Sequence, residues 1–113
     1  MNTQLDPIIL LSALTRTHEL VQRGWCQGDY AQLADGSFAL TNDPAVCKWS
    51  VIGATYVALF DLNRTDLLPR VSGYLHNFLP PGINYPEDYN DLPTTTQADI
   101  LALLNRAIEG MKK

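Results

Sequence analysis

The chain has 113 residues, with a hydrophobic fraction of 46% and a charged fraction of 18%; we expect one globular domain over residues 1–113 that needs neither a disulfide nor a metal to fold. Its formal net charge is -4 at pH 7, and its eight Lys and Arg residues are scattered, which argues against binding to nucleic acid or to an anionic membrane. We therefore expect a protein partner, with a basic surface favoured, although an acidic surface also serves solubility alone.

The start of the chain resembles neither a secretory leader nor a membrane anchor. No basic region precedes an apolar core in residues 1–11, and the longest mostly apolar run, residues 51–60, is about half the length that a membrane helix needs. We therefore expect a cytoplasmic protein. In that compartment Cys26 and Cys47 are expected to stay reduced and to pack as small apolar side chains.

A first helix is predicted over residues 7–23. Asp6 is suited to cap the free amide groups at its start, Pro7 fits the first turn, and Gly24 is the residue type that ends helices. An apolar stripe runs along one face of this helix and includes His18. We expect this stripe, with its histidine, to face the core.

A small hairpin is predicted next. Asp35 and Gly36 form a turn signal that separates two short segments, residues 30–33 and 37–40. A two-stranded hairpin is marginal by itself, so we expect it to lie against the helices.

A second helix is predicted from the cap-then-proline pair Asp43 and Pro44 to about Leu62. This segment is apolar around nearly its whole circumference, which is typical of a helix at the centre of a fold. Gly53 and Ala54 are expected to let a neighbouring backbone approach closely, which offsets the cost of about 1 kcal/mol that glycine brings to a helix.

The rest of the chain predicts two further helices separated by a loop. Asp66 is placed to cap the third helix, with Pro69 in its first turn. Residues 80–93 hold four of the seven prolines and no apolar periodicity, so we expect an ordered loop of a type that is often functional. Thr96 and Asp99 resemble a capping box at the start of the last, amphipathic helix. The predicted fold class is mainly α: a compact bundle of about four helices with a small β-hairpin and a proline-rich ordered loop.

Residues 24–28, with the sequence Gly-Trp-Cys-Gln-Gly, are the first candidate binding segment. Between two glycines, Trp25, Cys26 and Gln27 are placed to present a thiol or a carboxamide at a surface. The structural interpretation is that Gly24 ends the first helix while Trp25 and Cys26 fill the core. We favour the structural interpretation because buried cysteines far outnumber nucleophilic ones.

A second candidate lies in the proline-rich loop, at Glu87, Asp88, Tyr89, Asn90 and Asp91. Clustered carboxylate and carboxamide oxygens are ligands for calcium or magnesium, but their spacing here fits no EF-hand. Asn and Asp side chains more often bond to nearby backbone in turns. We therefore favour Asn90 or Asp91 as residues that pin the loop to the domain, with Glu87 and Asp88 exposed, and we predict neither a metal site nor a cofactor.

His18, Cys26 and Asp91 would form a Cys-His-Asp catalytic arrangement if the fold brought them together. The favoured alternative is a core histidine in a buried polar network, with Asp91 as its natural partner. The chain also has no glycine-rich phosphate loop, no paired-cysteine metal site and no Gly-x-Ser-x-Gly elbow. An enzyme is therefore less favoured than a binding protein, and no catalytic residue is predicted.

Three short motifs together resemble a known family: Gly-Trp-Cys-Gln-Gly at 24–28, Gly-Ala at 53–54 and Tyr-Asn-Asp at 89–91. In order and rough spacing the chain is similar to short, uncharacterised bacterial and phage proteins grouped as a domain of unknown function. The resemblance covers nearly the whole chain and implies a bacterial or phage source but no activity. Two positions depart from the family pattern: Ser50 stands where the family typically has Cys, and Tyr89 replaces the usual Trp. If that family cysteine were catalytic, this chain would lack the activity.

The favoured hypothesis is a protein-binding or regulatory module, either a monomer or a small homo-oligomer, with the loop and the hairpin as candidate contact surfaces. Small phage-type or mobile-element-type inhibitors of a host protein fit this description, as do many housekeeping domains. The alternative is a small enzyme or ligand-binding protein that uses His18, Cys26, Asn90 and Asp91. A third hypothesis is a self-associating structural protein with excess apolar surface on its second and fourth helices.

Overall fold

The computed structural model describes residues 5–112, which form five α-helices and a two-stranded antiparallel sheet. The elements are α1 (Pro7–Arg23), β1 (Ala31–Gln32), β2 (Lys48–Trp49), α2 (Val51–Asp61), the 3-10 helix η1 (Thr65–Leu67), α3 (Leu68–His76), α4 (Pro86–Asn90) and α5 (Gln97–Gly110). The mainly α fold class with a small β element is therefore confirmed. Residues 1–4 and residue 113 lie outside the described residues. Residues 1–4 belong to the segment that was compared above with a secretory leader. None of the helices formed by residues 5–112 is long and apolar enough to cross a membrane.

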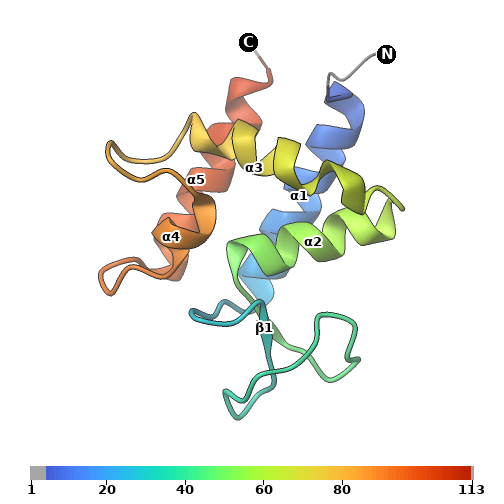
Figure 1. Cartoon of the computed structure of the whole chain (residues 1–113), viewed down its shortest axis with the longest axis vertical. Coiled ribbons are helices and arrows are strands. Elements are labelled where there is room, and N and C mark those ends of the chain that lie inside the picture. The colour runs from blue at the N-terminus through green and yellow to red at the C-terminus, as the bar shows by residue number, and fades with distance from the viewer. Residues whose placement is uncertain (1–4, 113) are drawn as a thin grey trace.

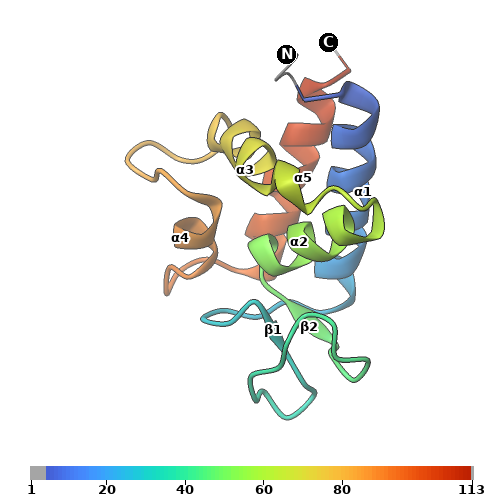
Figure 2. The ribbon, with the colours of Figure 1, turned by 45° about the vertical axis from the view of Figure 1, so that its right-hand side comes forward.

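Helices α1 and α5 lie side by side and run in opposite directions, so that α1 begins at the end of the molecule where α5 finishes (Figures 1 and 2). Helix α2 packs across α1, and α3 packs against both α2 and α5. The sheet and the turns around it lie at the opposite end of the molecule (Figure 1). The helices enclose one apolar core, whose largest fully buried side chains include Leu14, Val21, Val51, Leu59, Val71, Leu75, Ile100 and Leu104.

The two long helices begin and end where local sequence signals place them. The Asp6 carboxylate accepts a hydrogen bond from the Ile8 amide at 2.8 Å, and α1 ends at Arg23, before Gly24. Helix α5 has both halves of the predicted capping box between Thr96 and Asp99. The local polar groups satisfy amides that would otherwise lack partners at a helix start, so these boundaries depend little on the rest of the fold.

The predicted start of the second helix is wrong. Asp43 caps only a turn, where its side chain accepts from the Ala45 amide at 2.8 Å, and α2 begins eight residues later at Val51. The actual N-cap is Ser50, whose hydroxyl accepts from the Gly53 amide at 3.1 Å. The intervening Lys48–Trp49 segment is extended because it pairs with β1, and this tertiary pairing outweighs the local cap signal.

The predicted hairpin is only partly present. The turn at Gly36 forms, with φ of 87°, and the Ala39 amide donates to the Ala31 carbonyl at 3.1 Å. The ladder partner of β1 is nevertheless β2, in the register Ala31 to Trp49. Residues 37–40 make a single bridge to β1 instead of a strand, because Trp49 is the buried residue and Phe38 is 63% exposed.

Two smaller expectations also need correction. Asp66 does not cap α3: its carboxylate accepts from Arg64 at 3.0 and 3.1 Å, and the chain enters α3 through η1, with Pro69 in the first turn as predicted. The expected loop over residues 80–93 contains the five-residue helix α4. A helix this short has no repeating apolar pattern from which the sequence would predict it.

Candidate functional site

Asn90 lies at the centre of a hydrogen-bonded junction between three parts of the chain. Its side chain is fully buried, and its Oδ1 accepts from Trp25 Nε1 at 2.8 Å and from the Val51 amide at 2.9 Å. Its Nδ2 donates to the Cys26 carbonyl at 3.0 Å and to Asp91 Oδ1 at 2.9 Å. A carboxamide offers two donors and two acceptor sites, so every one of them is used. Helix α4 is thereby tied to the segment after α1 and to the first turn of α2.

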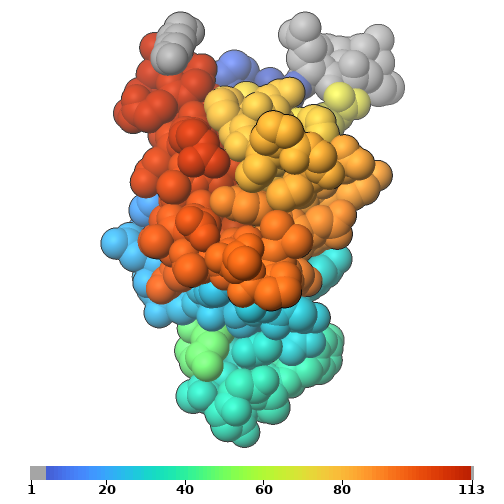
Figure 3. Space-filling model, turned by 90° about the vertical axis from the view of Figure 1, so that its left-hand side faces the viewer, coloured from blue at the N-terminus to red at the C-terminus, as the bar shows by residue number. Residues whose placement is uncertain are grey.

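Neighbouring residues extend this junction. Gln27 donates from Nε2 to the Asn90 carbonyl at 2.9 Å and to the Leu92 carbonyl at 2.8 Å, and the Gly28 amide donates to Asp91 Oδ1 at 3.0 Å. The two candidate segments, 24–28 and 87–91, therefore lie against each other, as the cyan and orange surfaces do in Figure 3. Their polar groups bond mainly to one another, which is the arrangement that the pinning interpretation describes. Glu87 and Asp88 are exposed, as expected, and Tyr89 is half-buried against the core.

Cys26 is placed as a structural residue. Its side chain is 5% exposed, and its Sγ donates to the Asp29 carbonyl at 3.5 Å. Burial, followed by the charges of Asp29 and Asp91, raises the pKa of the Cys26 thiol from 9.0 to about 11. The thiol therefore stays protonated at neutral pH, whereas a nucleophilic cysteine needs the thiolate.

We expect the two cysteines to differ in reactivity toward a disulfide reagent at pH 8. The pKa shift of Cys26 corresponds to about a hundredfold less thiolate, and burial slows access further. Thiol labelling followed by absorbance should show Cys47→Ser, which leaves only Cys26, reacting at least about tenfold more slowly than Cys26→Ser, since the greater nucleophilicity of a high-pKa thiolate offsets part of its lower population. In urea the two variants should react alike, and equal rates in the native state would show that Cys26 is reactive.

His18 is not joined to the other candidate residues. It is half-buried on α1, and within residues 5–112 no hydrogen bond links it to Cys26 or Asp91. Asp91 is exposed and bonds to the junction instead, so the structure forms neither the buried His18–Asp91 network nor the Cys-His-Asp arrangement. The buried polar pair on this helix face is Thr17 with Thr55, whose hydroxyl groups lie 3.5 Å apart. Across the same residues no group of three or more His, Cys, Asp or Glu side chains is arranged to hold a metal ion.

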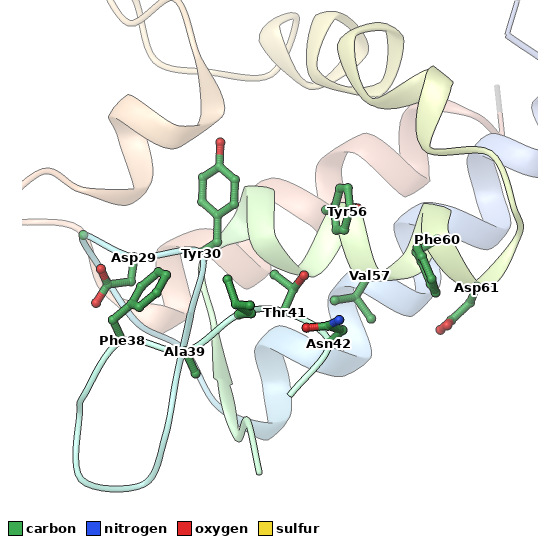
Figure 4. A pocket seen from close by; sticks show the side chains of 12 residues that line it. Asp29, Tyr30, Phe38, Ala39, Thr41, Asn42, Tyr56, Val57, Phe60 and Asp61 are labelled. Carbon is green, nitrogen blue, oxygen red and sulfur yellow. The ribbon is translucent and has the colours of Figure 1, made fainter. Parts of the chain in front are cut away.

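A cavity of about 820 Å³ lies beside this junction, between the segment of residues 28–42 and helix α2 (Figure 4). We call it the groove. Four of its large apolar side chains remain more than half exposed: Tyr30 by 55%, Phe38 by 63%, Leu40 by 65% and Phe60 by 61%. Tyr56, Val57 and Phe60 line it from α2. The groove is thus a solvent-exposed apolar surface with aromatic walls.

The charges that line the groove have one sign. Asp29 and Asp61 are among the lining residues, and these residues include no Lys or Arg. Arg16, which lies outside the lining, approaches Asp61 with 3.8 Å between Nε and Oδ2, and both side chains are substantially exposed. An exposed pair of this length contributes little stability, so Asp61 stays available to a cationic group.

Sequence reasoning did not predict that these residues form one groove. Phe38 and Leu40 belonged to the predicted hairpin, which was a candidate contact surface, and Phe60 belonged to the second helix, on which the third hypothesis placed excess apolar surface. The signal for that surface was the apolar character of the helix around its whole circumference, because a surface helix needs only one apolar face. The structure buries one side of α2 and leaves the side with Phe60 in the groove.

The comparisons with known proteins agree with the resemblance noted in the sequence. The model of a family described as "Family of unknown function (DUF6197)" matches residues 8–110. This range runs from the first turn of α1 to the end of α5 and includes both the junction and the groove. No curated protein and no solved structure matches the chain.

Proposed function

The chain belongs to the family of unknown function DUF6197, a membership that assigns it no activity, and we propose that it is a protein-binding module. In this proposal the groove receives an apolar segment of a partner protein. The observation that supports it is the gathering of Tyr30, Phe38, Leu40 and Phe60, all largely exposed, along one cavity. Contiguous apolar surface is costly to expose, and aromatic side chains of this kind supply much of the energy at protein interfaces.

The part of the groove wall at Tyr30 is tied to the helices, which favours binding. The Tyr30 carbonyl accepts from the Ser50 amide at 3.1 Å and packs against Gly53 of α2. The Asn90 junction holds residues 26–28 at the same end of the groove. A surface that is already ordered loses less conformational entropy when a partner docks, so more of the contact energy remains as affinity.

Charge supports a basic partner. The groove is lined by Asp29 and Asp61, and the chain carries a formal net charge of -4. Complementary charge speeds encounter and selects among partners more than it adds affinity. We extend the proposal to a site of action in the cytoplasm of a bacterial or phage-infected cell, where an inhibitor of a host protein is one role that such a module fits.

An enzyme built on His18, Cys26, Asn90 and Asp91 is the weaker proposal. Cys26 is a protonated thiol, and all the hydrogen-bonding groups of the Asn90 side chain are used inside the fold. A small-molecule ligand remains a second candidate for the groove, because its volume of about 820 Å³ lies within the usual range for such pockets.

An affinity purification tests the binding module. Tagged wild-type protein, the double variant Phe38→Ser with Phe60→Ser, and the control Ile8→Ser are each incubated with lysate of the natural host and read by mass spectrometry. Ile8 is 77% exposed on α1, outside the groove, so its replacement removes a similar apolar side chain elsewhere. We expect a protein that is enriched by the wild type and by Ile8→Ser, and that falls about tenfold or more with the double variant.

Two results would count against the proposal. One is the absence of any protein enriched by the wild type. The other is a partner that the double variant retains while its melting temperature shows that it is folded.

A further inference from the structure

A second cavity, of about 470 Å³, lies between α3 and the residues that lead into α4. Its polar wall carries Ser72, His76 and Glu87, and Tyr85 beside them is 57% exposed. Tyr30 lines both this cavity and the groove. In Figure 4 the Tyr30 ring stands beside the start of α2 and points away from Phe38.

Both cavities are lined in part by α2. Ile52 lines the second cavity, while Tyr56 and Phe60 line the groove, and these residues are spaced four apart. Residues at this spacing lie on one face of a helix, and eight residues span about 12 Å of helix axis. That length corresponds to about four residues of extended chain. A span of about 12 Å accommodates a continuous peptide segment better than a single side chain.

The second cavity offers hydrogen-bond acceptors. His76 Nδ1 lies 2.8 Å from the Asn84 carbonyl oxygen, which can only accept, so Nδ1 carries a proton and donates it. In the neutral ring Nε2 is then left with its lone pair. Glu87 adds a carboxylate to the same lining, in which there is no Lys or Arg. Acceptors within one lining match a side chain that only donates, such as the ammonium group of Lys or the guanidinium group of Arg.

We infer that the groove and the second cavity are adjoining subsites for one extended segment of a partner protein, which places apolar side chains in the groove and a Lys or Arg against Glu87 and His76. This inference rests on the proposed function and specifies the partner. A second copy of the acidic chain would meet like charge along this surface, and nucleic acid would bring phosphates to it.

Selection from a displayed library of random peptides about twelve residues long, on the immobilised full chain, tests the inference. A segment of this length covers the span of about 12 Å along α2 with residues to spare. We expect enriched peptides to share two or more large apolar residues and a Lys or Arg at a constant distance from them. A selected peptide, labelled for fluorescence anisotropy, should bind Phe60→Ser about tenfold or more weakly than the wild type.

Glu87→Gln should lower the affinity for the same peptide about three- to fivefold at low salt, and by a smaller factor at high salt. Glu19→Gln, the same change at an exposed position of α1, should leave its affinity unchanged. Replacing the basic residue of the peptide with Gln should abolish the effect of Glu87→Gln, because the two changes remove the same interaction.

The outcomes separate the two proposals. The inference would be overturned, and the binding module left intact, by peptides that depend on Phe60 but share no basic residue. Peptides that depend on Phe60 and bind Glu87→Gln with the same affinity as the wild type would have the same consequence. Peptides that bind Phe60→Ser as well as the wild type, or no enrichment at all, would overturn both. A concentration-dependent dimer in sedimentation that Phe60→Ser abolishes would identify a second copy as the occupant and would also overturn the inference.

Discussion

Replacing Asn90 with Ala is expected to lower the free energy of unfolding by about 3–5 kcal/mol. The substitution removes the partner of Trp25 Nε1, of the Val51 amide and of the Cys26 carbonyl, all at a fully buried position. Each buried group left without a hydrogen bond costs about 1–3 kcal/mol. Urea unfolding followed by Trp fluorescence and circular dichroism measures the loss as a lower midpoint at an unchanged slope.

Two further variants give this measurement its controls. Asn105→Ala removes an exposed carboxamide from α5 and should change stability by no more than about 0.5 kcal/mol. Asn90→Asp keeps the oxygen that accepts from Trp25 and Val51, but it replaces the amino group with a second oxygen that faces the Cys26 carbonyl and the Asp91 carboxylate. We therefore expect a loss at least as large as that of Asn90→Ala, because a carboxylate would be buried next to a like charge. If Asn90→Ala costs less than about 1 kcal/mol, the junction does not hold α4 in place.

Replacing Gly53 with Ala is expected to destabilise the protein by about 3 kcal/mol or more, although the same change usually stabilises a helix. An added Cβ would overlap the Tyr30 carbonyl oxygen and approach the Tyr30 Cα to 3.0 Å, so backbone rather than a flexible side chain would have to move. That backbone forms a wall of the groove and also accepts the Ser50 amide. Thermal and urea unfolding should both show the loss.

Gly73→Ala supplies the matched control. Gly73 lies in α3, and no heavy atom comes within 4 Å of its added Cβ, so alanine should raise stability by about 0.5–1 kcal/mol. The two glycine-to-alanine changes, both within helices, are therefore expected to alter the free energy of unfolding in opposite directions. A stabilising Gly53→Ala would mean that the segment carrying Tyr30 does not lie against α2.

These two substitutions also connect the fold with the proposed function. Gly53 and Asn90 lie outside the lining of the groove, yet each holds a part of it: Gly53 admits the backbone of Tyr30, and Asn90 anchors Cys26. A partner bound in the groove should therefore stabilise the wild type by mass action. Destabilised but folded variants at these two positions should bind it more weakly, because the groove is then less well ordered.

The amino-acid sequence by itself determined the elements whose signals are local. Asp6 with Pro7 places the start of α1, the Thr96–Asp99 capping box places the start of α5, and the apolar stripe of α5 marks the face it buries. On α1 the buried face is rotated away from the predicted stripe, so that His18 is only half-buried. Gly53 also pointed correctly to a close backbone approach. Such signals suffice because a cap or a helix face involves residues only three or four positions apart.

The tertiary structure alone decided which distant segments meet. The strand at Lys48–Trp49 exists because β1 pairs with it, so the cap signal at Asp43 ends in a turn. The Asn90 side chain bonds to residues 39 to 65 positions away, and the groove combines residues 28–42 with α2. No periodicity or local motif encodes contacts at such separations, since they depend on packing that forms only when the whole chain has folded.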